Sequence, residues 1–357
     1  MINIEKLLKE MSPIIDESIE KYIPKSYDKN SLISTTGIPR YDYHLGAVNK
    51  TIAEPIWDFL NREGKRWRPV LMLLVCEALG GDPKNLLDFV IIPEVIHNGT
   101  LMIDDIEDSS ELRRGKPCTY KIFGLDVAIN AGNAMYYLPL LILHKNRNKF
   151  SAETMNKIYE IYVQEMVNIS FGQAMDIAWH KGLANTDEIT EQQYLQMCAF
   201  KTGTLARMSA KIGAVLVGAN DGTVENIGKL AENVGVAFQI QDDILNLTGE
   251  EFAERKGGPG EDITEGKITL MVINALNKAT PENKKELMDI LKMHTTDQNL
   301  RNRAIEIIKQ CGSIEYAKDF AKRIVEDSWS EVNKLLPESE AKDKLKAFAY
   351  YLIDRKI

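Results

Sequence analysis

The sequence predicts an all-α fold, a single-domain helical bundle. Apolar residues recur at the spacing of one helix face in most segments, whereas runs of alternating β-branched and polar residues closed by a hairpin turn are nearly absent. The connections between the helical segments are short, and the sequence contains no Ser/Pro-rich linker and no internal repeat of fixed period. We therefore expect one domain over residues 1–357, in which residues 1–50 form an N-terminal helix and a loop arm.

Several segments carry the apolar stripe of a helix that packs on a core. In chain order they cover residues 4–23, 53–60, 70–79, 87–106, 155–179, 199–217, 227–247, 268–276 and 314–325. Ser313 precedes the last of them and is expected to cap it, because a serine side chain can accept a hydrogen bond from the first N–H groups of a helix. Residues 26–45 have the weakest helical pattern, which is compatible with an ordered loop or with a mobile arm.

Composition and charge exclude several classes of protein. Hydrophobic residues make up 44% and charged residues 27%, which is typical of a globular chain. No apolar run reaches the roughly 18 residues of a membrane span, and the first residues, MINIEKLLKEMSP, do not resemble a secretory signal, so we expect a cytoplasmic protein. The net charge of −8 argues against broad nucleic-acid binding, and the four cysteines form no CxxC pair of a zinc knuckle or a thioredoxin-type motif.

Two acidic clusters stand in apolar surroundings. Asp104 and Asp108 are one helical turn apart with Asp105 beside them, and Asp242-Asp243 repeats the arrangement far along the chain. Carboxylates about 4 Å apart repel by about 4 kcal/mol at an effective dielectric constant near 20, so each cluster needs a compensating cation. Magnesium favours such oxygen ligands and usually also binds substrate phosphates, which points to a diphosphate ligand. A solvated helix face is the alternative for either cluster alone.

Basic segments occur on both sides of the first acidic cluster. GKRWRP lies upstream at 64–69, and ELRRGKP lies downstream at 111–117. Guanidinium groups bind phosphate oxygens in pairs, so both segments can hold phosphates, although either alone could be a charged helix end. A Gly-rich stretch at 256–267 carries further lysines but lacks the GxxxxGK[ST] spacing of a P-loop.

Together these motifs resemble the trans-isoprenyl diphosphate synthases, and more narrowly the geranylgeranyl diphosphate synthases. The matching pieces are GKRWRP at 64–69, HNGTLMIDDIEDSSELRRGKP at 97–117, GQAMD at 172–176, KTG at 201–203, FQIQDD at 238–243 and EDITEGK at 261–267. The resemblance implies an isoprenoid-synthase-type helical bundle around a central cavity, usually a homodimer. It also implies a magnesium-dependent head-to-tail prenyl transfer, in which an allylic diphosphate ionises and isopentenyl diphosphate attacks the cation.

The resemblance assigns a role to each matching residue. The ligands of about three Mg²⁺ ions would be Asp104, Asp108, Asp242 and Asp262, and the catalytic set would be Asp104, Asp105, Asp108, Arg113, Lys201, Asp242, Asp243 and Lys267. The allylic diphosphate would bind Arg113, Lys201, Lys256 and Lys267. Isopentenyl diphosphate would bind Lys65, Arg68, His97 and Arg114. Thr202 and Gln239 would lie near the developing cation.

Two positions depart from the family pattern. The second acidic motif ends in Asn246 rather than aspartate, which predicts a weaker neutral ligand or a hydrogen-bond donor, and Asp262 can supply the missing carboxylate. Lys256 lies eleven residues before Lys267, a slightly longer separation than in the family. Asp176 is expected in an outer shell around the metal ions.

The length of the product depends on the floor of the cavity. In this family the product grows alongside the helix that bears the first acidic motif, and Gly99 and Thr100, one turn before Asp104, are too small to stop it at fifteen carbons. The deeper floor is expected at Ile96 on the same helix or at Tyr136 or Tyr137 on the next, and we favour the tyrosine pair, with ordinary core aromatics as the alternative. Replacing Gly99 by Phe is then expected to shorten the product.

Three other functions stay open at this point. A longer-chain (C25 or more) polyprenyl synthase differs only in the floor. A class I terpene cyclase or head-to-head synthase also uses acidic helices and magnesium, but it does not need the basic segment at 64–69 or the second arginine of the RRG. A catalytically silent helical subunit would be expected to lose acidic or basic motif residues, and nearly all are present here.

Overall fold

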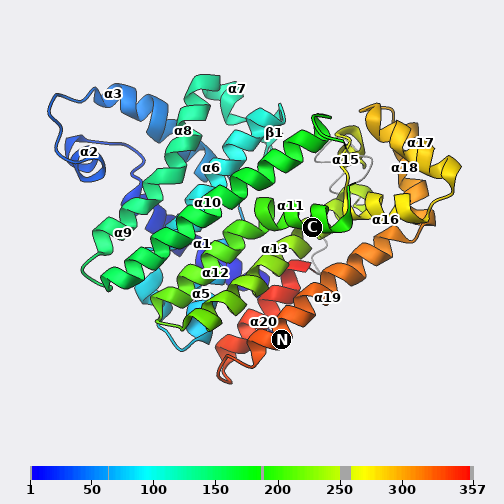
Figure 1. Ribbon diagram of the computed structural model, residues 1–357. Coiled ribbons are helices and arrows are strands. Elements are labelled where there is room, and N and C mark those ends of the chain that lie inside the picture. Colours follow the sequence, from blue (N-terminus) through cyan, green and yellow to red (C-terminus); the bar gives the residue numbers. More distant parts are fainter. Residues whose placement is uncertain (1, 63, 186–188, 250–258, 354–357) are drawn as a thin grey trace. The chain divides into compact units, whose positions relative to one another are not determined.

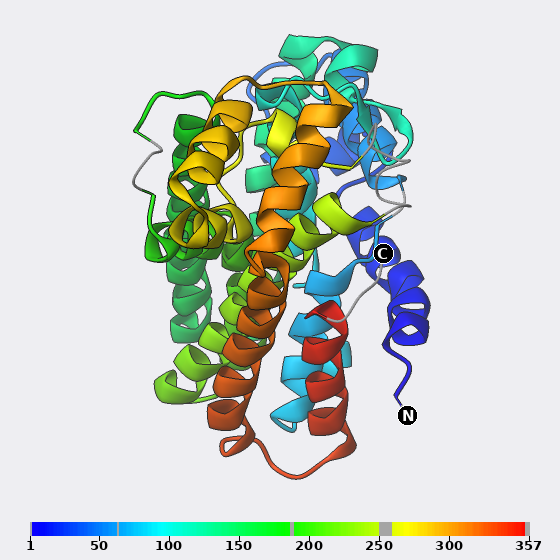
Figure 2. The same cartoon turned by 90° about the vertical axis from the view of Figure 1, so that its right-hand side faces the viewer.

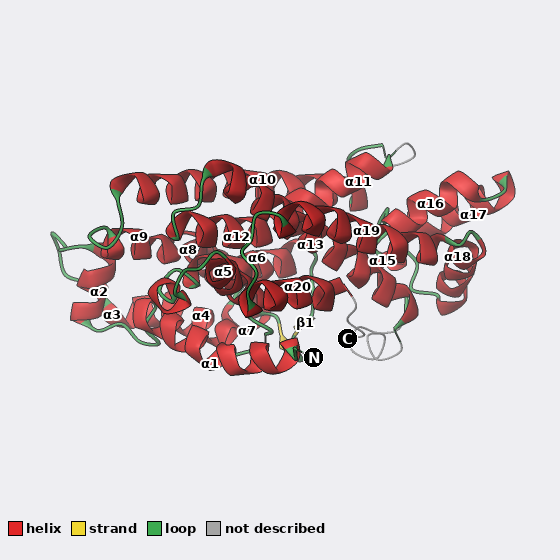
Figure 3. Ribbon diagram, turned by 90° about the horizontal axis from the view of Figure 1, so that it is seen from below, coloured by secondary structure: helices red, strands yellow, loops and turns green. Residues whose placement is uncertain are grey.

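The computed structural model describes residues 2–62, 64–185, 189–249 and 259–353, and helices dominate it throughout (Figure 1; Figure 3). The prediction of an all-α fold is confirmed. The contacts between residues divide the chain into two compact units, Met1–Tyr159 with Ile212–Ala219, and Glu160–Lys211 with Asn220–Ile357. Whether the two units form one domain stays a prediction.

The first unit contains the helices of the N-terminal half. They are α1 (Ile4–Tyr22), α2 (Lys29–Thr36), α3 (Leu45–Val48), α4 (Glu54–Leu60), α5 (Trp67–Ala78), α6 (Ile91–Glu107), α7 (Thr119–Phe123), α8 (Leu125–Tyr137), α9 (Leu141–Asn146) and the start of α10 (Ala152–His180). Short turns of other helix types, η1 (Asn49–Ala53), η2 (Pro83–Leu86) and η3 (Leu138–Leu140), join them. The apolar residues of α5 and most of those of α6 are buried, so these two helices carry much of the core of this unit.

Part of the segment 26–45 is ordered as a helix. The side chain of Asp28 caps α2 by accepting a hydrogen bond from the Ser31 N–H at 2.7 Å. Leu32 is buried in a small cluster with Tyr27 and Ala53, which holds α2 in place. Ile38, after the helix, is 91% exposed, whereas Tyr43 and Leu45 pack against the same cluster as Leu32.

Helices α6 and α8 cross closely at two glycines. A Cβ on Gly99 would lie 2.8 Å from the Cβ of Met135 and 3.0 Å from the carbonyl oxygen of Gly132. Gly132 in turn faces the side chain of Ile103. A side chain at Gly99 would therefore have to push α6 and α8 apart, and the role of Gly99 in product length stays a prediction.

A small hairpin follows α6. Strand β1 (Leu112–Arg113) pairs antiparallel with β2 (Lys116–Pro117), and the two residues of the turn, Arg114 and Gly115, have positive φ angles of 53° and 74°. Two consecutive left-handed residues match the twist of a tight hairpin. The sequence signal was weak because arginine, rather than asparagine or aspartate, precedes the glycine.

The second unit contains the rest of α10 and most of the C-terminal helices. They are α11 (Glu191–Cys198), η4 (Ala199–Gly203), α12 (Thr204–Leu216, which passes into the first unit), α13 (Asp221–Thr248), α15 (Glu261–Thr264), α16 (Leu270–Lys278), α17 (Pro281–Lys292), α18 (Gln298–Gln310), α19 (Ser313–Asn333) and α20 (Glu340–Ile353). Helix α13 packs along α19 and also contacts η4 and α20 (Figure 2). The long helix α13 is thus the centre of this unit.

The start of α19 differs from the prediction. Gly312, with φ of 65°, is the residue before the helix, and Ser313 is its first residue. The hydroxyl of Ser313 donates to Oδ1 of Asn274 at 3.0 Å, so it links α19 to α16 and does not cap its own helix. The predicted Ser313 cap is therefore wrong.

Candidate active site

The first acidic cluster lies at the carboxyl end of α6. Asp104 and Asp105 belong to the last turn, and Asp108 ends the helix by donating its N–H to the carbonyl of Asp104 at 2.9 Å. Asp105 is buried, Asp104 is partly exposed and Asp108 is exposed. Carboxylates at this end of a helix meet the negative end of its dipole, which makes the cluster a place where a cation is favoured.

Arg113 of the hairpin is paired with the buried member of this cluster. Its Nε and Nη2 both approach Oδ1 of Asp105, at 2.7 and 2.6 Å, and Nη2 lies 3.8 Å from Oδ2 of Asp104. Burial raises the pKa of Asp105, and Arg113 opposes that shift. Asp105 therefore orients Arg113, which fits its predicted supporting role.

Several arginines of the first unit lie close together. Burial lowers the pKa of Arg68 to about 10, and Arg114 adds to that shift. Burial also lowers the pKa of Arg114 to about 10, with Arg66 and Arg113 contributing, although Glu94 opposes the shift. His97 lies beside them, and burial together with Arg68 and Arg114 holds its pKa well below the usual value. The protonated forms of these side chains repel one another, so a bound anion would stabilise them.

A buried chain of hydrogen bonds holds two of these arginines. Arg66 donates to Asp16 at 3.0 Å and to Glu94 at 2.7 Å, and the same Glu94 oxygen accepts from Asn98 at 2.8 Å. Oδ1 of Asn98 accepts from Arg114 at 3.2 Å. The chain fixes Arg66 and Arg114 against α6. Asp16 and Glu94 belong to no recognised motif, and Asn98 lies in the matching stretch 97–117 but received no role there. Their signal in the sequence is only a polar residue on an apolar helix face.

Arg68 and Lys65 differ in their surroundings. The guanidinium of Arg68 lies 4.3 Å from the ring centre of Trp67, and its buried Nε has no hydrogen-bond partner among the described residues. A buried donor without a partner is costly, so a ligand atom that accepts from it would be stabilising. Lys65 is exposed, one residue before the left-handed Arg66 that starts α5.

The four residues predicted to set chain length have different surroundings. Gly99 is packed against α8, as described above. The hydroxyl of Thr100 donates to the carbonyl of His97 at 2.8 Å. Tyr136 is half-buried next to Gly99, and burial raises its pKa, with Glu107 and Asp104 adding to the shift. Tyr137 is 67% exposed, so it does not form a buried floor in this chain.

In the second unit, Lys201 is held by Asp176. Its Nζ donates to Oδ2 of Asp176 at 2.5 Å, between η4 and α10. Lys201 and Thr202 lie in η4, a π-helical turn, and such turns are frequent at functional sites. Gly172 allows the contact, because a Cβ there would lie 2.3 Å from the backbone nitrogen of Lys201.

A second hydrogen-bonded chain links η4 to α13. Thr202 donates to Oε1 of Gln239 at 2.9 Å, and the amide of Gln239 donates to Oδ1 of Asp243 at 2.9 Å. The hydroxyl of Tyr194 donates to Oδ2 of Asp243 at 2.7 Å. Burial raises the pKa of Asp243, and Asp262 adds to the shift. Tyr194 was not singled out by the sequence, because a buried tyrosine on an amphipathic helix has the pattern of a core residue.

Asn246, Asp262 and Lys267 form a third group in the second unit. Oδ1 of Asn246 accepts from the Asp262 N–H at 3.1 Å, so Asn246 fixes the start of α15 as an acceptor. Nζ of Lys267 donates to Oδ1 of Asp262 at 3.2 Å and also pairs with Glu265. Burial alone would lower the pKa of Lys267, but Asp262, Glu265 and Asp176 more than offset it and raise the pKa well above its usual value.

The carboxylates of the site are suited to a magnesium ion that also binds the phosphates of a ligand. Among the described residues, no three His, Cys, Asp or Glu side chains are grouped as ligands of one metal ion. Magnesium commonly takes only one or two carboxylates and completes its shell with waters and phosphates, so carboxylates such as Asp104 and Asp108 at a helix end are suitable. Asp242 lies partly exposed on α13 beside the buried Asp243. Lys256, the second lysine predicted for the allylic diphosphate, lies outside the described residues.

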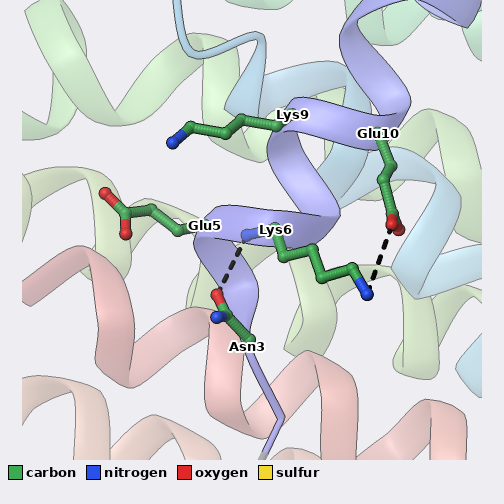
Figure 4. A pocket seen from close by; sticks show the side chains of 5 residues that line it. All are labelled: Asn3, Glu5, Lys6, Lys9 and Glu10. Carbon is green, nitrogen blue, oxygen red and sulfur yellow. Dashed lines mark hydrogen bonds and ion pairs between the residues drawn. The ribbon is translucent and has the colours of Figure 1, made fainter.

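Figure 4 shows a pocket that none of the predicted site residues lines. It lies at the start of α1 and is lined by Asn3, Glu5, Lys6, Lys9 and Glu10. The N–H of Lys6 donates to Asn3 at 2.9 Å, and its ammonium lies 3.7 Å from Glu10. These are the contacts of a helix cap and an exposed ion pair, so the pocket carries no sign of catalysis.

Comparisons with known proteins agree on one family. The family described as polyprenyl synthetase matches residues 49–308. The chain is 33% identical to a geranylgeranyl diphosphate synthase of Saccharolobus solfataricus, over 86% of this chain and 91% of the relative. It is 32% identical to a short chain isoprenyl diphosphate synthase of Methanothermobacter thermautotrophicus over 99% of both. Its structure resembles a geranylgeranyl pyrophosphate synthetase from Pyrococcus horikoshii with a TM-score of 0.83, 30% identity and 98% coverage of both chains.

Tyr194 gives a test of the second hydrogen-bonded chain. Tyr194→Phe removes one donor from the buried carboxylate of Asp243, and we expect it to lower the free energy of unfolding by about 1–3 kcal/mol. Urea denaturation measures the loss. The matched control is Tyr137→Phe at an exposed position, for which we expect a change within about 0.5 kcal/mol. Equal effects of the two substitutions would contradict the assigned hydrogen bond.

Proposed function

Because the chain belongs to the polyprenyl synthetase family, we propose that it is a magnesium-dependent prenyltransferase that makes geranylgeranyl diphosphate. Its substrates would be isopentenyl diphosphate and an allylic diphosphate. The observation that carries this proposal is the arginine cluster of the first unit, which consists of Arg66, Arg68, Arg113 and Arg114. It lies beside the acidic end of α6, and this combination suits a diphosphate and its cation. Relatives of similar length with 30% identity or more, named as geranylgeranyl diphosphate synthases, support the product.

Isopentenyl diphosphate is assigned to Lys65, Arg68, His97 and Arg114. The depressed pKa values of Arg68 and Arg114 support this, because a diphosphate would stabilise their charged forms. The partnerless Nε of Arg68 is available to a phosphate oxygen. Arg114 is fixed through Asn98 and Glu94, so this end of the substrate would meet a pre-organised donor.

The allylic diphosphate is assigned to Arg113, Lys201, Lys256 and Lys267. Asp105 orients Arg113, and Asp176 orients Lys201, so these cations hold their positions before substrate arrives. The magnesium ligands would be Asp104, Asp108, Asp242 and Asp262, with three ions in all. When bound, magnesium would neutralise the diphosphate and stabilise the charge that accumulates on it as it leaves.

The reaction needs no side-chain nucleophile. The C–O bond of the allylic diphosphate breaks, the double bond of isopentenyl diphosphate forms the new C–C bond, and a proton leaves the adjacent carbon for the released diphosphate. Thr202 and Gln239 would face the developing cation. Gln239 is held by two hydrogen bonds, one donated to Asp243 and one accepted from Thr202. The oxygen dipoles of both side chains would stabilise positive charge at that position.

We propose that the protein forms a homodimer and that it is cytoplasmic. Helix α10 exposes Val163, Val167 and Phe171, which recur every four residues and therefore lie on one face. An exposed apolar stripe of this kind is typical of a surface that a second subunit covers. Among the residues that the structure describes, no helix has the length and apolar character to cross a bilayer.

Product analysis tests the proposed function. The purified protein, with magnesium and labelled isopentenyl diphosphate, is given dimethylallyl, geranyl or farnesyl diphosphate, and the dephosphorylated products are sized. We expect a twenty-carbon alcohol, loss of turnover when magnesium is chelated, and at least about a 100-fold lower kcat for Asp104→Ala. Asp319→Ala, an exposed carboxylate on α19, is the control and should leave kcat unchanged. Products of twenty-five carbons or more would replace the proposed product, and no condensation with any primer would overturn the proposal.

Tyr136 is proposed as the residue that limits product length. It is half-buried against α6, whereas its neighbour Tyr137 is exposed. Tyr136→Ala would remove the ring and is expected to lengthen the main product by at least one five-carbon unit. Tyr137→Ala is the matched control and is expected to leave the product unchanged. The same product length from Tyr136→Ala and the wild type would reject the assignment.

A further inference from the structure

Arg62, a residue of no recognised motif, contacts both strands of the β1–β2 hairpin. It lies just after α4 and its side chain is completely buried. Nη1 donates to the carbonyl of Arg113 on β1 at 3.3 Å, and Nη2 donates to the carbonyl of Pro117 on β2 at 2.9 Å. One guanidinium therefore bridges the two strands.

Further contacts fix Arg62 itself. Nη2 also donates to Oδ2 of Asp58, one turn earlier on α4, at 2.6 Å. Its guanidinium carbon lies 5.4 Å from the ring centre of Phe59, and that of Arg114 lies 5.6 Å from the same ring. The backbone carbonyl of Arg62 accepts from Nη1 of Arg114 at 3.4 Å. Arg62 thus touches the hairpin through its side chain and through its backbone.

The hairpin is too short to be stable through its own strand pairing. Each strand has two residues, and isolated two-stranded ribbons are marginally stable in water. Its turn includes Arg114 in the left-handed region, which is unfavourable for a residue with a side chain. Yet Arg113 and Arg114, adjacent on this hairpin, reach two different partners on α6, Asp105 and Asn98. The position of the hairpin therefore decides where both guanidinium groups lie.

We propose that Arg62 is a positioning residue that sets Arg113 and Arg114 together, and with them the binding of both diphosphates. This inference rests on the proposed function, which assigns Arg113 to the allylic diphosphate and Arg114 to isopentenyl diphosphate. Lysine cannot replace Arg62, because an ammonium is a compact point charge and does not span two carbonyls and a carboxylate in one plane. Arg62 contacts no substrate, so its loss weakens binding more than it slows the chemical step.

The test compares Arg62→Lys and Asp58→Asn with the wild type. Losing the bridge between the strands is expected to raise KM for both substrates about tenfold in Arg62→Lys, while kcat changes less than about twofold. Asp58→Asn, which loosens Arg62 without removing it, should give a smaller shift of the same kind. In the double variant the Asp58→Asn effect should disappear, since both act through one contact. The matched control is Arg301→Lys, a buried arginine that donates to the carbonyl of Thr296 at 3.1 Å, and both KM values should stay unchanged.

The outcomes separate this inference from the proposed function. A shift in only one KM, or unchanged KM values with a lower melting temperature, would make Arg62 a merely structural residue and overturn the inference. Calorimetric titration with isopentenyl diphosphate gives a second readout, in which Arg62→Lys should weaken Kd about tenfold. If the wild type condenses no primer, the proposed function fails, and the two Kd values still decide the role of Arg62. Equal Kd values for the wild type and Arg62→Lys, or no binding of isopentenyl diphosphate by the wild type, overturn the inference about Arg62.

Discussion

The structure of the first unit depends on how its buried and partly buried arginines are neutralised. Arg66 is paired with Asp16 and Glu94, Arg113 with Asp105, and Arg62 with Asp58. Removing one partner of such a buried pair leaves an uncompensated charge, which is strongly destabilising. Arg68 and Arg114 have weaker compensation, as their depressed pKa values indicate. The surplus positive charge of the cluster is therefore concentrated where a diphosphate can balance it.

Helix α6 connects this charge balance to the fold. Its buried face carries Glu94 and Asn98, which fix the arginines, and its carboxyl end carries Asp104 and Asp108, which favour a cation. Gly99, between these two regions, allows α8 to pack closely. A glycine that the sequence suggested as space for product thus serves the packing that keeps both ends of α6 in place.

The sequence was most informative where chemistry needs a fixed spacing. The two acidic clusters, the arginine segments and the apolar stripes of helices such as α6 and α13 were all visible in it, because each depends on residues within one or two turns. Tyr194, Glu94 and Arg62 were not, since each also has a partner far along the chain. The separations are 49 residues for Tyr194, 28 for Glu94, and 51 and 55 for the two strand carbonyls that Arg62 contacts. Ser313 was misread because its hydroxyl contacts a neighbouring helix, which local spacing does not reveal. The packing of Gly99 against α8 was not visible in the sequence for the same reason.

Ligand-dependent unfolding tests whether the arginine cluster of the first unit binds a diphosphate. A ligand that binds only the folded protein stabilises it by about 2.7 kcal/mol at a hundred times its Kd. Isopentenyl diphosphate should therefore raise the melting temperature of the wild type, whereas isopentenol, which lacks the diphosphate, should not. Arg114→Met should lose the effect. No rise with isopentenyl diphosphate, or an equal rise with the alcohol, would contradict diphosphate binding by the cluster.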